Sequence, residues 1–328
     1  MTASVQPDDT ADPFHRIDTS VAHPARRYNY WLGGKDHFAA DRASGDAIAN
    51  VFPAVRTAAL ENRRFLHRTV AYLAGTAGIR QFLDVGVGIP LPPNTHDIAQ
   101  RIAPSCRVVY VDNDPIVLTH ARALLTSHPH GATAYVDADL RDPVSILRHP
   151  DVHRTIDLAQ PVGLLLIAVL HFLTDEQATR AVATLLDALA PGSYVALSHG
   201  TTDFWTADTA AQVPQLQRGS ETPYRPRSRE QIAGFVAGLH LVDPAPATPA
   251  PAAGTTTPTG QPGARLVPVV RWRPDRDDGQ DLRDDEVACY GLVAHIAGPV
   301  PQPGSAPTGS ALFSSRPARP ASQDGVHP

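Results

Sequence analysis

Three apolar segments in the middle of the chain are each followed by an acidic residue. Asp84 closes QFLD and precedes Gly86 and Gly88, Asp112 closes VVYVD, and Asp139 follows AYVDA. An apolar run that glycines interrupt is typical of a buried parallel strand turning into a helix, where the backbone lies close to a ligand. Asp112 follows this turn at an offset near the roughly 20 residues at which a carboxylate meets ribose hydroxyls in doubly wound folds. We therefore predict that Gly86, Asp112 and Asp139 meet on one rim that fits a nucleoside.

A second set of polar residues could act on a substrate. His171 directly follows the fourth apolar run, which predicts that it lies at the carboxyl end of a sheet. It is interpreted either as a general base or as a histidine held by a backbone carbonyl. The segment YNYWLGGKDHF contains Tyr30, Gly34 and Asp36 and shows no core period. It is interpreted either as a surface loop or as a lid that excludes water from the site. The candidates for catalysis are Tyr30, Asp36 and His171, and Gly34 is a candidate for binding a cofactor under such a lid.

Alternating strands and helices must position these residues. The fourth apolar run, VGLLLIAVL, is typical of a central strand that is covered on both faces. Strand and helix patterns that alternate indicate right-handed crossovers and a parallel sheet with helices on both faces. Further strands are expected within LHLV, ARLVPVVRW and ACYGLVAHI. The parallel strands are predicted at residues 81–85, 107–112, 132–136, 162–168 and 194–199.

The order of patterns along the chain predicts its organisation. Polar and proline-rich stretches without periodicity are expected to be disordered, and a Pro/Thr/Ala-rich stretch inside the second half is expected to be a mobile insertion. Helical periodicity precedes the first strand and predicts an amino-terminal helical cap. The expected divisions are a disordered start (1–13), the cap or lid (14–78), an α/β domain (79–298) with the insertion (244–263), and a disordered tail (299–328).

Composition narrows the class of protein. The 328 residues include 42% hydrophobic residues and carry a formal net charge of −5, so no general excess of positive charge favours nucleic acid. No stretch reaches the roughly 18 apolar residues of a membrane span, and the polar start has no leader pattern, so a cytoplasmic location is expected. The two cysteines are too few for a disulfide framework, and no metal site is predicted. The sequence leaves the oligomeric state open.

Several long phrases of the chain are shared with one known family. These phrases are RIDTSVAHPARRYNYWLGGKDHFAADR, FLDVGVGIP, VVYVDNDPIVLTHARALL, DADLRDP, AVLHFLTDE, LAPGSYVALSHG and YGLVAH. They resemble the actinobacterial S-adenosyl methyltransferase family, formerly a domain of unknown function. The resemblance implies a Rossmann-like class I methyltransferase fold with a seven-stranded, mostly parallel sheet and a bound S-adenosyl-L-methionine. It implies no particular acceptor substrate, and a small molecule is expected.

The resemblance also implies roles for residues at matching positions. The glycine turn would pack against the methionine and ribose parts of the cofactor. Asp112 would hold the ribose, and Asp139 would meet the adenine. The end of the fourth strand would run under the sulfonium. Similar proteins carry threonine where this chain has Val87, which removes one hydroxyl contact. The implied cofactor-binding residues are Asp84, Gly86, Gly88, Asp112, Asn113, Asp139, Leu140, Ala168 and Val169.

Two other functions stay open at this point. One is an NAD(P)-dependent Rossmann oxidoreductase, which is disfavoured because Leu91 stands where the dinucleotide fingerprint has its third glycine. The other is a regulatory module that binds S-adenosylmethionine without catalysis. The favoured prediction is a methyltransferase.

Overall fold

The computed structural model describes residues 18–297 apart from 125, 217–222, 245–265 and 275–280. The predicted disordered start, the tail, and the insertion from residue 245 onward lie outside the described residues.

The strands form one sheet in the order β3-β2-β1-β4-β5-β8-β6, and β7 pairs with β8 beside this path. The neighbours from β3 to β5 are parallel, whereas β8 runs antiparallel to β5, β6 and β7. This topology confirms the predicted Rossmann-like α/β fold. The strands are β1 (Gln81–Val85), β2 (Arg107–Asp112), β3 (Ala132–Asp137), β4 (Gly163–Ile167), β5 (Tyr194–Gly200), β6 (His240–Leu241), β7 (Val267–Pro268) and β8 (Cys289–His295).

One late strand is much shorter than the sequence pattern suggested. ARLVPVVRW was expected to be a strand, but only Val267–Pro268 pairs with β8, and the chain then forms the 3-10 helix η3 (Val269–Arg271). Proline lacks the backbone N–H that a continuing ladder needs, so Pro268 marks the end of pairing. The described residues form a sheet with seven strands along its main path, the number that the family resemblance implied, and β7 as an eighth short strand beside β8.

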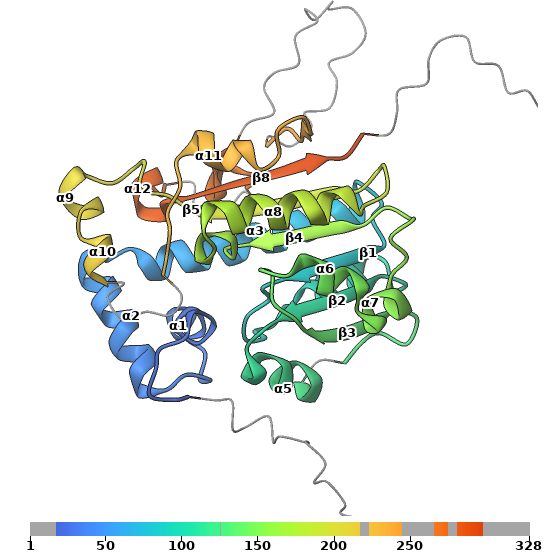
Figure 1. The fold of residues 1–328 in the computed structure, drawn as a ribbon, viewed down its shortest axis with the longest axis horizontal. Helices are drawn as coiled ribbons and strands as arrows, with labels where there is room; N and C mark the ends of the chain where they lie inside the picture. The colour runs from blue at the N-terminus through green and yellow to red at the C-terminus, as the bar shows by residue number, and fades with distance from the viewer. Residues whose placement is uncertain (1–17, 125, 217–222, 245–265, 275–280, 298–328) are drawn as a thin grey trace, which may run out of the picture. The chain divides into compact units, whose positions relative to one another are not determined.

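The period-two alternation of each central strand places side chains in two cores. Leu83, Val109 and Leu164 pack into the core with α6, α7 and α8, while Phe82 and Leu165 pack into the core with α3 and α4. Figure 1 shows α6, α7 and α8 on the near face of the sheet and α3 on the far face. The helices of these two layers are α3 (Val55–Gly75), α4 (Thr95–Ile102), α6 (Pro143–Arg148), α7 (Pro150–Thr155) and α8 (Asp175–Asp187).

Two of the remaining helices cover the carboxyl end of the sheet. In Figure 1, α1 and α2 lie beyond the carboxyl ends of the strands. No helix in the described ranges combines the length and the apolar content needed to cross a membrane. The other helices are α1 (Pro24–Trp31), α2 (Ala39–Val51), α5 (Pro115–Leu124), η2 (Leu170–Phe172), α9 (Ala207–Ala210), α10 (Val213–Leu216), α11 (Arg229–Gly234) and α12 (Asp284–Val287).

The amino-terminal segment differs from the expected loop. The YNYW part of YNYWLGGKDHF is the second half of α1, which begins at Pro24, and only residues 32–38 form a loop. Proline is favoured in the first turn of a helix because its missing N–H has no partner there in any case. The helix buries Arg26, Arg27 and Asn29 rather than an apolar stripe, so hydrophobic periodicity could not reveal it.

Candidate functional site

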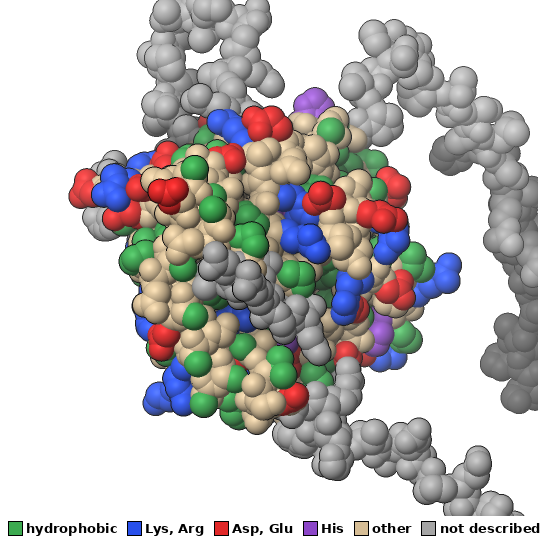
Figure 2. Space-filling view, turned by 60° about the vertical axis from the view of Figure 1, so that its left-hand side comes forward, with side chains coloured by type: hydrophobic (Ala, Val, Ile, Leu, Met, Phe, Trp, Pro, Cys, Tyr) green, Lys and Arg blue, Asp and Glu red, His purple; other side chains and the backbone are tan. Residues whose placement is uncertain are grey.

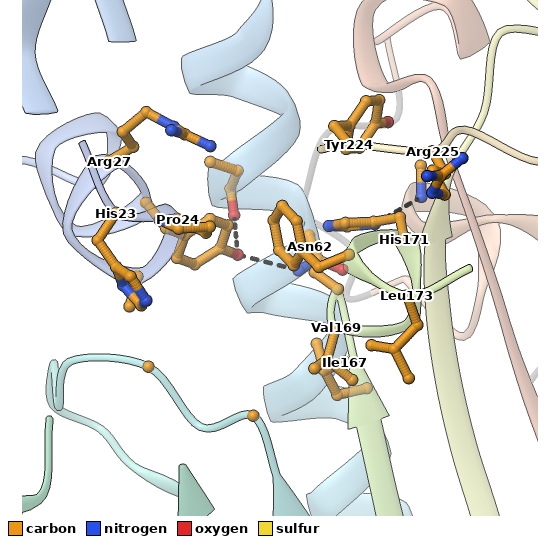
Figure 3. Close-up of a pocket in the computed structure, with 18 of the residues that line it drawn as sticks. His23, Pro24, Arg27, Asn62, Ile167, Val169, His171, Leu173, Tyr224 and Arg225 are labelled. Carbon is orange, nitrogen blue, oxygen red and sulfur yellow. Dashed lines mark hydrogen bonds between the residues drawn. The ribbon is translucent and has the colours of Figure 1, made fainter. Parts of the chain in front are cut away.

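A cavity of about 630 Å³ lies at the carboxyl ends of the central strands. Its walls come from the ends of β1, β2 and β4, from α1, α2 and α3, and from Trp205, Val213 and residues 223–225. Figure 3 shows how these elements face one another, with His23 and Arg27 on the α1 side and Ile167 and Val169 on the strand side. A volume of this size is within the range of small-molecule sites.

The glycine turn after β1 depends on a backbone conformation that other residues rarely adopt. Gly86 and Gly88 have φ angles of 75° and 67°. The Gly86 N–H donates to the carbonyl of Val111 at 2.8 Å, and the Gly88 N–H donates to Oδ2 of Asp112 at 2.8 Å. A Cβ at Gly86 would lie 2.8 Å from Cβ of Val169, so the turn packs directly against the segment after β4.

Asp112 and Asp139 line the same cavity and are connected through their neighbours. Oδ1 of Asp112 accepts from the N–H of Asp114 at 2.9 Å, and burial raises the pKa of the Asp112 carboxyl. Burial alone would also raise the pKa of Asp139, but hydrogen bonds from Arg141 and Asn113 outweigh it and lower that pKa. The Asn113 amide donates to Oδ2 of Asp139 at 3.1 Å, which links the ends of β2 and β3.

Asp84 is the most deeply enclosed acid of the cavity wall, with 3% of its surface exposed. The hydroxyl of Thr95 donates to its Oδ2 at 2.6 Å. Burial raises the pKa of Asp84 to about 6, against the lowering effects of Thr95 and Arg63. This carboxyl therefore changes charge close to physiological pH.

The segment after β4 holds three of the predicted residues. The Ala168 N–H donates both to the carbonyl of Ser198, at 3.1 Å, and to its hydroxyl, at 3.0 Å. Ala168 has a φ angle of 53°, which is uncommon for a residue with a Cβ. Ala168, Val169 and His171 all line the cavity, as does Leu140 after β3.

His171 is a buried, neutral imidazole. Its Nδ1 accepts from the N–H of Gly200 at 3.4 Å, so the neutral ring carries its proton on Nε2. Burial, followed by the positive fields of His199, Arg227 and Arg27, holds its pKa well below the usual value. His171 is thus a hydrogen-bond donor at Nε2 rather than a strong base.

Arg227 fixes the loop that carries His171. Its guanidinium donates to the carbonyls of Leu170 and Leu173, each at 2.9 Å, and to Nε2 of His199 at 2.8 Å. Nδ1 of His199 lies 2.7 Å from the carbonyl of Gly200, so both of its ring nitrogens are occupied. His199 therefore has a structural role beside the cavity.

A buried network that the sequence did not reveal connects the helical cap to the sheet. Ser198 donates to Oδ1 of Asn62 at 2.5 Å, and the Asn62 amide donates to the Tyr28 hydroxyl at 2.9 Å. Tyr28 in turn donates to the carbonyl of Ala59 at 2.9 Å, and burial raises its pKa to about 12. Figure 3 shows Asn62 at the centre of this arrangement. No local pattern in ENRRF singles out Asn62.

The structure does not bring Tyr30, Gly34 or Asp36 to the cavity wall. The Tyr30 hydroxyl donates to Asp46 at 2.8 Å on an exposed face, because its position on α1 directs it toward α2. Asp36 pairs with Nε2 of His120 at 3.2 Å. Gly34 packs against the side chain of Asn29. The predicted rim residues do converge, whereas these three from the expected lid do not.

The surface of this side of the molecule carries mixed charge. On the face in Figure 2, the coloured basic and acidic side chains are intermingled around hydrophobic and neutral atoms, and the coloured residues form no continuous basic patch there.

Comparisons with known proteins identify the family. The family model for S-adenosyl methyltransferases matches residues 10–249. A DUF574 family protein from Streptomyces avermitilis MA-4680 is 44% identical, with a TM-score of 0.76 over 85% of this chain and 98% of that one. A candidate methyltransferase from Thermobifida fusca YX is 38% identical, with a TM-score of 0.73 over 86% and 97%. No curated protein sequence matches the chain.

The match spans most of the chain, and the site at the strand ends lies within it. The chain therefore belongs to the S-adenosyl methyltransferase family and is an S-adenosyl-L-methionine-dependent methyltransferase that acts on an acceptor substrate.

Proposed function

We propose that the three strand ends hold S-adenosylmethionine and that the acceptor is a small molecule enclosed beside it. The single observation that supports this best is one cavity that reaches all three acids and continues to the helices α1, α2 and α3. In this proposal the nucleoside is held by Asp112, Asn113, Asp139 and Leu140, the methionine part by Asp84, Gly86 and Gly88, and the sulfonium side by Ala168 and Val169.

The geometry of Asp112 fits a ribose. Each of its oxygens accepts one backbone N–H, from Gly88 and from Asp114. A carboxylate has about four lone-pair sites, so capacity remains for two hydroxyl donors. The same two backbone bonds fix the carboxylate before any ligand arrives, which reduces the entropy cost of binding.

Bound S-adenosylmethionine supplies an electrophilic methyl group that needs no covalent help from the protein. The contribution of this chain is therefore alignment and exclusion of water. Helices α1 to α3 cover the cavity, and the Tyr28, Asn62 and Ser198 network ties them to β5. His171 contributes a hydrogen bond from Nε2 that orients the acceptor.

A largely apolar acceptor region within a cavity of this size supports a small molecule rather than a macromolecule. Phe52 on the α2 side and Trp205 lie with ring centroids 5.0 Å apart, and both line the cavity. A cytoplasmic location also stays a proposal, which the buried free thiols of Cys106 and Cys289 support.

Two measurements test this function. Calorimetric titration should show binding of S-adenosylhomocysteine and none of NADH. The protein is then incubated with methyl-labelled S-adenosylmethionine and a host extract, which is separated by ultrafiltration. Chromatography of the filtrate should show label in a compound other than S-adenosylmethionine that is absent when the protein is left out. Label confined to retained protein or nucleic acid would contradict a small-molecule acceptor.

A further inference from the structure

Arg27 on α1 is a buried guanidinium without a partner. Only 8% of its surface is exposed, and its side chain forms no hydrogen bond or ion pair with any residue that the structure describes. It lines the cavity, and Figure 3 shows it extending from α1 toward α3. A buried charge without a partner is costly, so such groups usually have a ligand or a paired residue.

The nearest acid does not neutralise this charge. Asp41 attracts Arg27, but it also lies 3.4 Å from Nε of Arg26 and accepts backbone bonds from His23 and Phe38. Asp41 is thus engaged by other groups and forms neither a hydrogen bond nor an ion pair with the Arg27 guanidinium. Burial lowers the pKa of Arg27, yet a guanidinium remains protonated at any physiological pH.

None of the acids in the described cavity wall lies on α1 or α2. They are Asp84, Asp112 and Asp139, and all three lie at the ends of the strands. The α1 and α2 side offers donors instead, namely Arg27 and the buried Nε1–H of Trp205, which has no acceptor. The surrounding wall is apolar and aromatic: Trp31, Ile48, Val51, Phe52 and Val213.

We propose that the methyl acceptor is an organic acid, with an apolar or aromatic body and one carboxylate that Arg27 binds. The inference rests on the proposed function of the cavity. A carboxylate is favoured over a phosphate ester because Arg27 is the one arginine of the described cavity wall that is both buried and without a hydrogen-bond partner. It balances a single negative charge, whereas a phosphate ester carries nearly two. The planar guanidinium also matches a carboxylate with two parallel hydrogen bonds.

Matched acids and amides test this inference in the full-length protein. The probes are benzoate, 3-phenylpropionate and 2-naphthoate, each beside its uncharged amide, and binding is followed by ligand-observed NMR with and without S-adenosylhomocysteine. A hydrogen bond to a charged group contributes enough that at least one acid should bind about tenfold more tightly than its amide. The preference should disappear in Arg27→Gln and partly return in Arg27→Lys.

Arg56→Gln is the matched control, because Arg56 pairs with Asp46 outside the cavity wall. It should keep the full preference for the acid. Circular dichroism and thermal melting show that each variant is folded. Arg27→Gln should keep an affinity for S-adenosylhomocysteine within about twofold of wild type, and a larger loss in the folded variant would assign Arg27 to the carboxylate of the cofactor and overturn the inference. If the wild-type protein does not bind S-adenosylhomocysteine at all, the proposed cofactor roles are contradicted. If cofactor binding is intact but no acid exceeds its amide, or the preference survives in Arg27→Gln, the organic-acid inference is overturned.

Discussion

Gly86→Ala tests whether the glycine turn is shaped by contact with the segment after β4. At Gly86 the φ angle of 75° would cost an alanine roughly 1–2 kcal/mol. The new Cβ would also lie 2.8 Å from Cβ of Val169 and closer still to one of its methyl groups. Rotation about χ1 cannot move Val169 Cβ, so the backbone must shift, at a cost typical of overpacking, about 1–3 kcal/mol. The sum is a loss of roughly 2–5 kcal/mol in the free energy of unfolding.

Gly88→Ala separates these two contributions. Its φ angle is 67°, but the nearest heavy atom to a Cβ there is Cβ of Ala25 at 3.9 Å, an ordinary contact. Only the backbone cost of roughly 1–2 kcal/mol is then expected. Adding Val169→Ala to Gly86→Ala should restore part of the lost stability by removing the closest methyl contact, while the contact with Val169 Cβ remains.

Urea denaturation with and without S-adenosylhomocysteine, together with calorimetric affinities, measures these differences. Gly86→Ala should be the less stable of the two single variants and should bind the ligand more weakly, because the shifted backbone carries the Gly86 and Gly88 amides. Equal stability of Gly86→Ala and Gly88→Ala would refute the role assigned to the Val169 contact.

Three further outcomes are expected. Asp112→Ala should weaken S-adenosylhomocysteine binding by about 1–3 kcal/mol by calorimetry, because ribose hydroxyls lose their acceptor; unchanged affinity in a folded variant would exclude this role. Burial raises the pKa of Asp84 to about 6, so its stabilising contribution is complete below the unfolded pKa near 4 and is lost as pH rises through about 6. Wild type should thus lose stability relative to Asp84→Asn by on the order of 2–3 kcal/mol between pH 4 and pH 7, measured as the difference between their free energies of unfolding. A difference that does not depend on pH would contradict the raised pKa of Asp84. Arg227→Met should remove one hydrogen bond from each of the Leu170 and Leu173 carbonyls and, by removing a nearby positive charge, raise the pKa of His171, which NMR titration detects; an unaltered titration would contradict the effect assigned to Arg227.

Much of the strand-end rim could be predicted from the sequence. Apolar runs of period two, the glycines of the turn, and acids such as Asp112 are local signals, because a parallel strand must end where its apolar run ends. Parallel strands bring their carboxyl ends to one edge, so the meeting of Gly86, Asp112 and Asp139 at one cavity followed from order alone. The family phrases added the cofactor, which neither periodicity nor spacing identifies.

Tertiary structure decided the acceptor side. The contact between Asn62 and Ser198 joins residues 136 positions apart, and neither residue has a neighbour pattern that predicts it. The segment with Tyr30 and Asp36 was predicted to be a lid or a surface loop. Instead, α1 directs Tyr30 toward Asp46 on α2, and the loop after α1 places Asp36 beside His120 on α5. The sequence does not single out Arg27, because its distinguishing feature is burial without an acidic partner, which only the fold creates. Side-chain partnership across a fold depends on how helices pack, and local sequence does not encode that.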